Sequence, residues 1–419
     1  SDVCSSDLQL ATAGTRHRQS IYDKGFSGNS MTLKSDELID FFKTTLKYID
    51  HSIQANKRND HLFHAYNLIS LKDDGISIRY LYEMLEGQVA VLSAGYLDTE
   101  QSLELLKSLR NSPLYREDQN SYILYPNRQL ARFAEKNIIS ENLLKKSAII
   151  DQWLTQKDTD IVEKDVNGDV HFHHSFRNAH LLAQALTEKN ISDKEKQEIL
   201  DIYEAVFDHQ SFTGRSGTFY KYEGLGSIYW HMVSKLLLAV QENYFQAVNT
   251  DADAEQIDEL KQVYYNIRKG IGSHKNPKDY GAFPTDPYSH TPGHRGVQQP
   301  GMTGQVKEDL ISRFGELGVF IENGCISFAP TLIKQTEFLN EKQEFVYYNV
   351  AGQKNIIELG PGNLAFTIAQ VPVIYRLSNA EKIKILFTNN DVEILAGNQL
   401  NPEISKSIFT RSEERRVGK

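Results

Sequence analysis

The spacing of apolar residues changes character at Val319, and this change limits the folds open to the chain. Before it, apolar residues recur at helical spacing, which predicts helices near 35–51, 81–95, 98–109, 138–156, 175–186, 192–206, 227–240, 254–269 and 305–317. After it, short alternating runs predict a hairpin at 319–328 and strands at 345–350, 355–359, 370–375, 383–387 and 392–395. The fold class predicted is mainly α, a partial (α/α) toroid over 9–318 followed by a small C-terminal antiparallel β-sandwich domain over 319–410.

Both ends of the chain have an unusual composition. Residues 1–8 and 411–419 resemble translated sequencing-adapter reads, so we expect them to be artefacts and the barrel domain to be truncated at its N-terminus. A signal peptide could not be seen in such a fragment. Residues 9–34 are polar and contain three glycines, which predicts irregular structure.

Charge and cysteine content exclude some classes of function. The formal net charge is −9 and no basic face is evident, which argues against a nucleic-acid partner. No apolar run reaches transmembrane length, so no membrane partner is expected. Cys4 lies in the adapter-like end and leaves Cys325 alone, which predicts no internal disulfide and a cytoplasmic location. The oligomeric state stays open, with a homodimer as one option.

A glycine-broken stretch lies just before the apolar helix at 227–240. Glycines let a backbone approach a ligand closely, and a helix start offers unpaired N–H groups. Aromatic rings around such a loop suit the flat faces of a sugar. We therefore predict a carbohydrate subsite with an anion or an activated water at its floor, formed by Gly214, Arg215, Ser216, Gly217, Tyr222, Gly224 and Gly226. The alternative is a tight turn between two helices that needs glycine for steric reasons.

Other polar residues are weaker candidates for sugar contacts. In the long loop at 273–305, His290, His294 and Arg295 are predicted to line the cleft, or else to hold a lid by internal hydrogen bonds. His173 is predicted to contact a sugar hydroxyl or to lie on a solvated face, because no carboxylate or cysteine pattern completes a metal site around it. Glu86 and Gln88 could bind sugar hydroxyls or form a buried polar clamp between helices.

Three segments, in the same order, resemble the inverting glycoside phosphorylases of the cellobiose and chitobiose phosphorylase type. They are residues 86–95, residues 166–173 and residues 214–230, which resemble the family's "WAVLSG" helix, its "ENG…H" segment and its glycine-rich phosphate stretch. The resemblance implies an (α/α)6 barrel with a β-sandwich, an oligosaccharide substrate, inversion at the cleaved bond, and inorganic phosphate as co-substrate with no other cofactor and no metal.

Two departures from the family pattern affect the chemistry. The family's Asp-Trp-Asn-Asp motif, which supplies the general acid, is missing, and Asp23 is the nearest carboxylate that could stand in for it. Glu223 stands where the family has a phosphate-binding threonine. A carboxylate there repels phosphate unless it is protonated or paired, for example with Arg215. It could instead activate water, as an inverting hydrolase requires. A non-catalytic sugar-binding relative is the third alternative.

Overall fold

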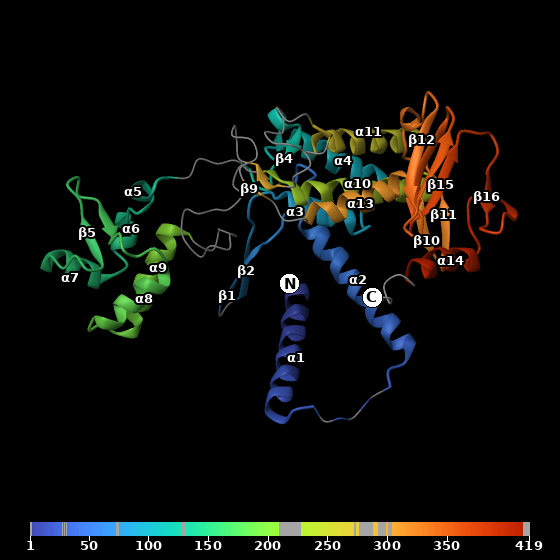
Figure 1. Ribbon diagram of the computed structural model, residues 1–419. Coiled ribbons are helices and arrows are strands. Elements are labelled where there is room, and N and C mark those ends of the chain that lie inside the picture. Colours follow the sequence, from blue (N-terminus) through green and yellow to red (C-terminus); the bar gives the residue numbers. More distant parts are fainter. Residues whose placement is uncertain are drawn as a thin grey trace.

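The structure is a computed structural model that describes residues 2–26, 28, 30, 32–72, 75–126, 131–208, 228–271, 274–275, 288–291, 299–300 and 304–413. Helices are its main regular structure, and the C-terminal region consists of small antiparallel sheets of two strands each (Figure 1). The chain is therefore mainly helical, as predicted. The partial toroid and the β-sandwich stay predictions.

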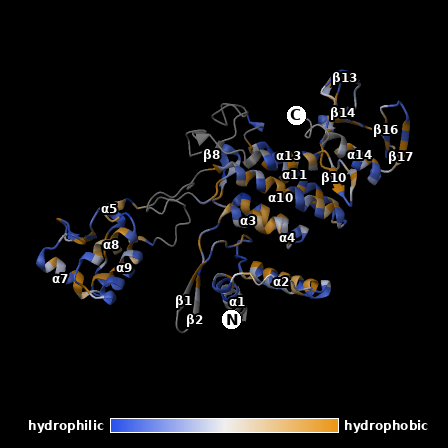
Figure 2. Cartoon of the chain, turned by 60° about the horizontal axis from the view of Figure 1, so that its bottom comes forward, coloured by the Kyte–Doolittle hydropathy of each residue, from blue (hydrophilic) through white to orange (hydrophobic). Residues whose placement is uncertain are grey.

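Two long helices open the chain. The prediction of irregular structure over residues 9–34 is wrong for residues 9–24, because α1 spans Asp2–Lys24 and ends at Gly25, which has a φ of 69°. Its side chains lack a clear apolar stripe, but Gln19 donates to Asp23 one turn away, a pairing that supports an exposed helix. Helix α2, Ser35–Ala55, buries none of its side chains and exposes several large apolar ones (Figure 2).

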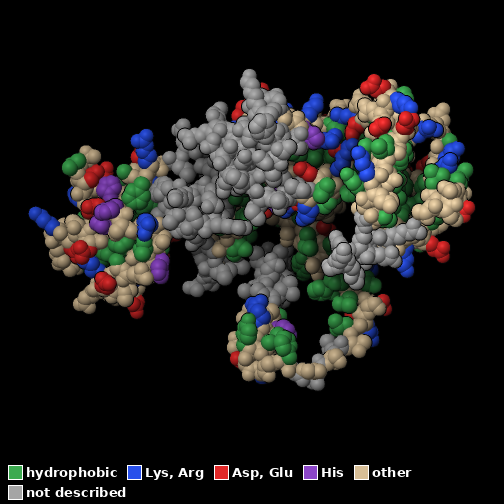
Figure 3. All heavy atoms as spheres, in the orientation of Figure 1, with side chains coloured by type: hydrophobic (Ala, Val, Ile, Leu, Met, Phe, Trp, Pro, Cys, Tyr) green, Lys and Arg blue, Asp and Glu red, His purple; other side chains and the backbone are tan. Residues whose placement is uncertain are grey.

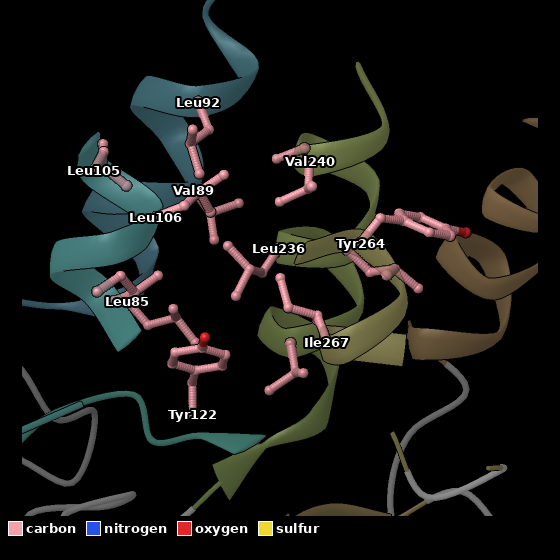
Figure 4. Close-up of a cluster of buried hydrophobic side chains, with 14 of the residues drawn as sticks. Leu85, Val89, Leu92, Leu105, Leu106, Tyr122, Leu236, Val240, Tyr264 and Ile267 are labelled. Atoms are coloured by element: carbon pink, nitrogen blue, oxygen red, sulfur yellow. The ribbon is translucent and has the colours of Figure 1, made fainter. Parts of the chain in front are cut away.

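Five helices form the main core, with α10 in contact with the other four. They are α3 (Leu85–Ser93), α4 (Thr99–Asn111), α10 (Trp230–Asn249), α11 (Ala254–Gly270) and α13 (Gly304–Glu316). Their apolar side chains converge from α3, α4, α10 and α11 (Figure 4), including Leu85, Val89, Leu92, Leu105, Leu106, Leu236, Val240, Tyr264 and Ile267. Short hairpins precede α10 in the chain: β1 (Leu68–Lys72) with β2 (Gly75–Arg79), which projects away from this core (Figure 1), and β3 (Tyr115–Arg116) with β4 (Ser121–Tyr122), which packs against it.

Residues 131–208 form a body with a hydrophobic core of its own (Figure 1). Its elements are α5 (Phe133–Lys136), α6 (Glu141–Leu144), α7 (Ala148–Gln156), β5 (Val162–Lys164), β6 (Val170–Phe172), α8 (Ala179–Glu188) and α9 (Asp193–Phe207). The predicted single helix at 138–156 is divided, because Ser147 is buried in an extended conformation between α6 and α7. Residues 166–169 form the turn between β5 and β6, with Gly168 at a φ of 90°.

The C-terminal region pairs each strand with its neighbour in the chain. The hairpins are β10 (Val319–Glu322) with β11 (Cys325–Phe328), β12 (Gln343–Tyr348) with β13 (Lys354–Leu359), β14 (Asn363–Ile368) with β15 (Val371–Arg376), and β16 (Lys382–Leu386) with β17 (Val392–Ala396). Helix α14, Pro402–Glu413, follows them. The predicted strands are confirmed, whereas β14 was not predicted. A third core, around Leu317, Ile333, Phe338 and Leu364, joins the end of α13 to these strands.

Gly318 makes the turn between α13 and the first C-terminal strand. Its φ is 68°, and a Cβ built on it would lie 2.2 Å from the backbone carbon of Ala329. Gly318→Ala is therefore expected to lower the free energy of unfolding by about 2 kcal/mol or more, through both backbone strain and overpacking. Gly324→Ala is the matched control, because Gly324 has a φ of 78° with no atom near its Cβ position. Urea denaturation of both variants measures the difference, and equal losses would contradict the steric contribution.

Candidate functional site

A small sheet brings two of the predicted functional segments to one end of α10. Strand β7 (Ile228–Tyr229), which directly follows the glycine-broken stretch, pairs with β8 (Tyr288–Thr291), which belongs to the long loop. Strand β9 (Gln299–Pro300) pairs with the other edge of β8. In this register Tyr229 lies opposite His290, so the backbone of His290 lies beside the N-terminus of α10. Its side chain is not among those described.

The remaining residues of these two segments lie outside the described part of the chain. They are Gly214, Arg215, Ser216, Gly217, Tyr222, Glu223, Gly224, Gly226, His294 and Arg295. Their predicted roles in binding sugar or phosphate, and that of Glu223 in activating water, stay predictions. The described side chains at the N-terminal end of α10 nevertheless show which chemical groups are present there.

A row of polar side chains, here called the polar seam, runs between α10 and α13 from this end. The hydroxyl of Tyr229 lies 3.3 Å from Nδ1 of His231, whose Nε2 lies 3.4 Å from Oε1 of Glu308. The ammonium of Lys307 lies 3.5 Å from the same Oε1. Glu308 is only 2% exposed, and its Oε2 has no hydrogen-bond partner among the residues that the structure describes. A buried polar atom without a partner is uncommon and requires an explanation.

The residue after Glu308 adds a second carboxyl group to the polar seam. Ser234 on α10 donates a hydrogen bond of 3.4 Å to Oδ1 of Asp309. Burial raises the pKa of Asp309, and the nearby charges of Glu308 and Glu316 raise it further, against the lowering effect of the Ser234 hydrogen bond. The first turns of α13 therefore contribute two neighbouring carboxyl groups, those of Glu308 and Asp309, to the polar seam.

The far end of the polar seam is an ionic network around Glu316. Glu316, 1% exposed, accepts from Arg268 at 2.9 Å, from Arg313 at 2.6 Å and from the hydroxyl of Tyr264 at 2.7 Å. Arg313 also contacts Glu337 at 2.7 Å. Both carboxylate oxygens of Glu316 are thus occupied by protein groups, which indicates a role in stability.

The two polar residues predicted on α3 have different environments. Gln88 is fully buried, and its amide exchanges two hydrogen bonds of 2.9 Å with the backbone of Phe63 while also donating to Met84. Gln88 therefore forms a buried polar clamp that joins α3 to the non-helical segment containing Phe63, and not one between two helices as predicted. Glu86 is half-buried. Partial burial, together with a hydrogen bond to Glu86, raises the pKa of Tyr66 to about 12.

Asp23 and His173 lie on elements other than the helices of the polar seam. Asp23 is exposed on α1, where it accepts a hydrogen bond of 2.8 Å from Gln19, and its role as general acid stays a prediction. His173 lies in the body of residues 131–208, where its Nδ1 is 2.7 Å from the hydroxyl of Ser175. Histidine side chains gather on one face of this body (Figure 3).

Neither a metal site nor a membrane span is found in the described part of the chain. Across the described ranges, no three His, Cys, Asp or Glu side chains come close enough together to hold a metal ion. Within those same ranges, every helix is too short or too polar to cross a bilayer.

One segment of the chain matches a known protein family. Residues 130–210 match the family model described as GH149 phosphorylase insertion domain 2. The match covers the body that has its own core, and it supports a glycoside phosphorylase family. It does not point to the cellobiose and chitobiose type in particular. No curated protein matches the chain.

Proposed function

We propose that this chain carries part of the catalytic apparatus of a glycoside phosphorylase that cleaves a glucosidic bond of an oligosaccharide with inversion. The match of residues 130–210 to a phosphorylase insertion domain is the observation that carries the proposal. The limits of the match agree with those of the separate body at 131–208, as an insertion between the helices of a larger domain requires. The cellobiose-type motifs at 86–95 and 214–230 support the same reaction.

In the proposed reaction, a phosphate oxygen attacks the anomeric carbon from the face opposite the glycosidic oxygen. The bond to that oxygen breaks, and a general acid supplies the proton that the leaving sugar needs. The product is a sugar 1-phosphate of inverted anomeric configuration. Phosphate would be held by backbone N–H groups of Gly214–Gly226 and by Arg215, which could also pair with Glu223. The general acid is not assigned.

The test is incubation of the full chain with α- and β-linked glucose disaccharides, with and without inorganic phosphate. We expect glucose 1-phosphate only when phosphate is present, detected by ³¹P NMR, with the anomeric configuration read from the proton coupling. Arg215→Gln is expected to lower kcat/KM for phosphate by about 100-fold or more, because it removes a charged hydrogen bond to the phosphate.

Two results would overturn the proposal in different ways. Release of free glucose in the absence of phosphate would instead support a hydrolase in which Glu223 activates water. Binding of disaccharide without turnover in either buffer would support a non-catalytic sugar-binding protein.

A further inference from the structure

Helix α13 buries two glutamates in contrasting environments. Glu308 and Glu316 are 2% and 1% exposed and lie two helical turns apart on the same face. Glu316 contacts two arginines and a tyrosine, so its burial is compensated within the protein. Glu308 has His231 and Lys307 near one oxygen only, and both lie at the long limit of contact distance. Burying a carboxylate oxygen without a partner costs stability, so a compensating role is expected at Glu308.

The location of Glu308 suggests what that role is. It lies in the first turns of α13, opposite His231 near the start of α10. His231 in turn contacts Tyr229 of β7, the strand that follows the glycine-broken stretch and pairs with the strand containing His290. The unpartnered oxygen therefore lies at the end of α10 where both predicted ligand-binding segments enter the described structure.

The chemistry of Glu308 limits the ligand it could take. A carboxylate oxygen accepts hydrogen bonds, so the missing partner is a donor. Asp309 lies next to it and burial raises the pKa of that residue, which indicates an environment unfavourable to further negative charge. A phosphate group beside these two carboxyl groups would be repelled. A neutral group with hydroxyl donors, such as a sugar ring, meets both conditions.

We propose that Glu308 is a saccharide-binding residue whose Oε2 accepts a hydrogen bond from a sugar hydroxyl of the substrate. The inference rests on the proposed function, since it takes the ligand to be the oligosaccharide of a glycoside phosphorylase. It assigns Glu308 to the sugar and leaves phosphate to the stretch that contains Arg215.

The experiment compares Glu308→Gln with Glu316→Gln in the full chain. The chain has two tryptophans, and Trp230 directly precedes His231, so a Trp153→Phe background leaves Trp230 as a local fluorescence probe. Titrations use α- and β-linked glucose disaccharides and, separately, inorganic phosphate. Calorimetry on the same samples checks the affinities, and thermal unfolding gives Tm.

We expect Glu308→Gln to weaken disaccharide binding about tenfold or more, the effect of losing one hydrogen bond to a charged acceptor. Its phosphate affinity should not fall, and its Tm should be unchanged or higher because the substitution removes a buried carboxylate oxygen that has no partner among the described residues. Glu316→Gln should show the reverse pattern, a lower Tm with unchanged disaccharide affinity in the folded protein.

Each other outcome has a defined meaning. If the parent chain binds disaccharide and Glu308→Gln binds it equally well, the inference is wrong while the proposed function stands. The inference is also wrong if Glu308→Gln lowers Tm as much as Glu316→Gln does, with no loss of affinity. If the parent chain neither binds nor cleaves any disaccharide of the panel, the proposed function fails and the inference fails with it.

Discussion

Glu316→Ala is expected to lower the free energy of unfolding by about 3–5 kcal/mol, the usual cost of removing one partner from a buried ion pair. Alanine would leave the guanidinium of Arg268 and the hydroxyl of Tyr264 without the acceptor that now lies 2.9 and 2.7 Å away. Arg313 would keep its contact with Glu337 at 2.7 Å, which limits the loss. The network joins α11 and α13 on either side of α10, so its failure weakens the main core.

Urea denaturation followed by Trp230 fluorescence measures this loss. Glu259→Ala is the matched control, because Glu259 forms an exposed ion pair with Lys107 at 2.9 Å between the same α11 and helix α4. Surface pairs of this kind contribute about 0–1 kcal/mol. Similar small losses in both variants would show that the buried network adds no more to stability than a surface pair.

Local sequence signals predicted the elements whose formation depends on neighbours along the chain. The helix predicted at 192–206 is confirmed, and it begins with a capping box in which Ser192 and Glu195 exchange hydrogen bonds at the start of α9. The hairpin predicted at 319–328 is likewise confirmed, with Asn323 and Gly324 at positive φ in the turn between β10 and β11. Such signals act within three or four residues and do not require the rest of the fold.

For helix α13, local signals predicted the span of the helix but not which of its faces is buried. Its span was predicted closely, but a helix is expected to turn its apolar stripe inward. Here Glu308, Ser312 and Glu316 are buried, whereas Leu310, Ile311 and Phe314 are 42–58% exposed. The buried face is set by polar partners on α10 and α11, which are far away in the sequence. The polar residues at positions i, i+4 and i+8 are the signal in the sequence that could have identified Glu308.

The part of the candidate site that was predicted consists of consecutive residues, and the part that was missed depends on contacts between distant segments. The glycine-broken stretch is recognisable because its residues are consecutive, although its role stays a prediction. The pairing of β7 with β8 depends on a contact between Tyr229 and His290 that no local pattern encodes. The contact of His231 with Glu308 likewise joins residues that lie on different helices. Sites assembled from distant segments become visible only once the helices are placed together.

The second large effect is expected in the body of residues 131–208. Tyr203 is fully buried there, with its ring 5.0 Å from that of Phe172 and 4.7 Å from that of Phe207. Its hydroxyl donates to the carbonyl of Phe176 at 2.7 Å. Tyr203→Ala removes the ring and leaves a cavity, at an expected cost of about 3–5 kcal/mol. That is a large part of the stability of a body this small.

The unfolding of Tyr203→Ala should be confined to this body, because its core is separate from the main core. The exposed ion pair of Arg79 with Asp208, at 2.8 Å, connects the two bodies and contributes little stability. Trp153 lies in the smaller core and Trp230 in the main core, so single-tryptophan forms report each separately. The urea midpoint should fall for Trp153 and stay unchanged for Trp230. Tyr203→Phe, which keeps the ring, should cost only about 1 kcal/mol. Equal shifts of both probes in Tyr203→Ala would show instead that the two bodies unfold as one cooperative unit.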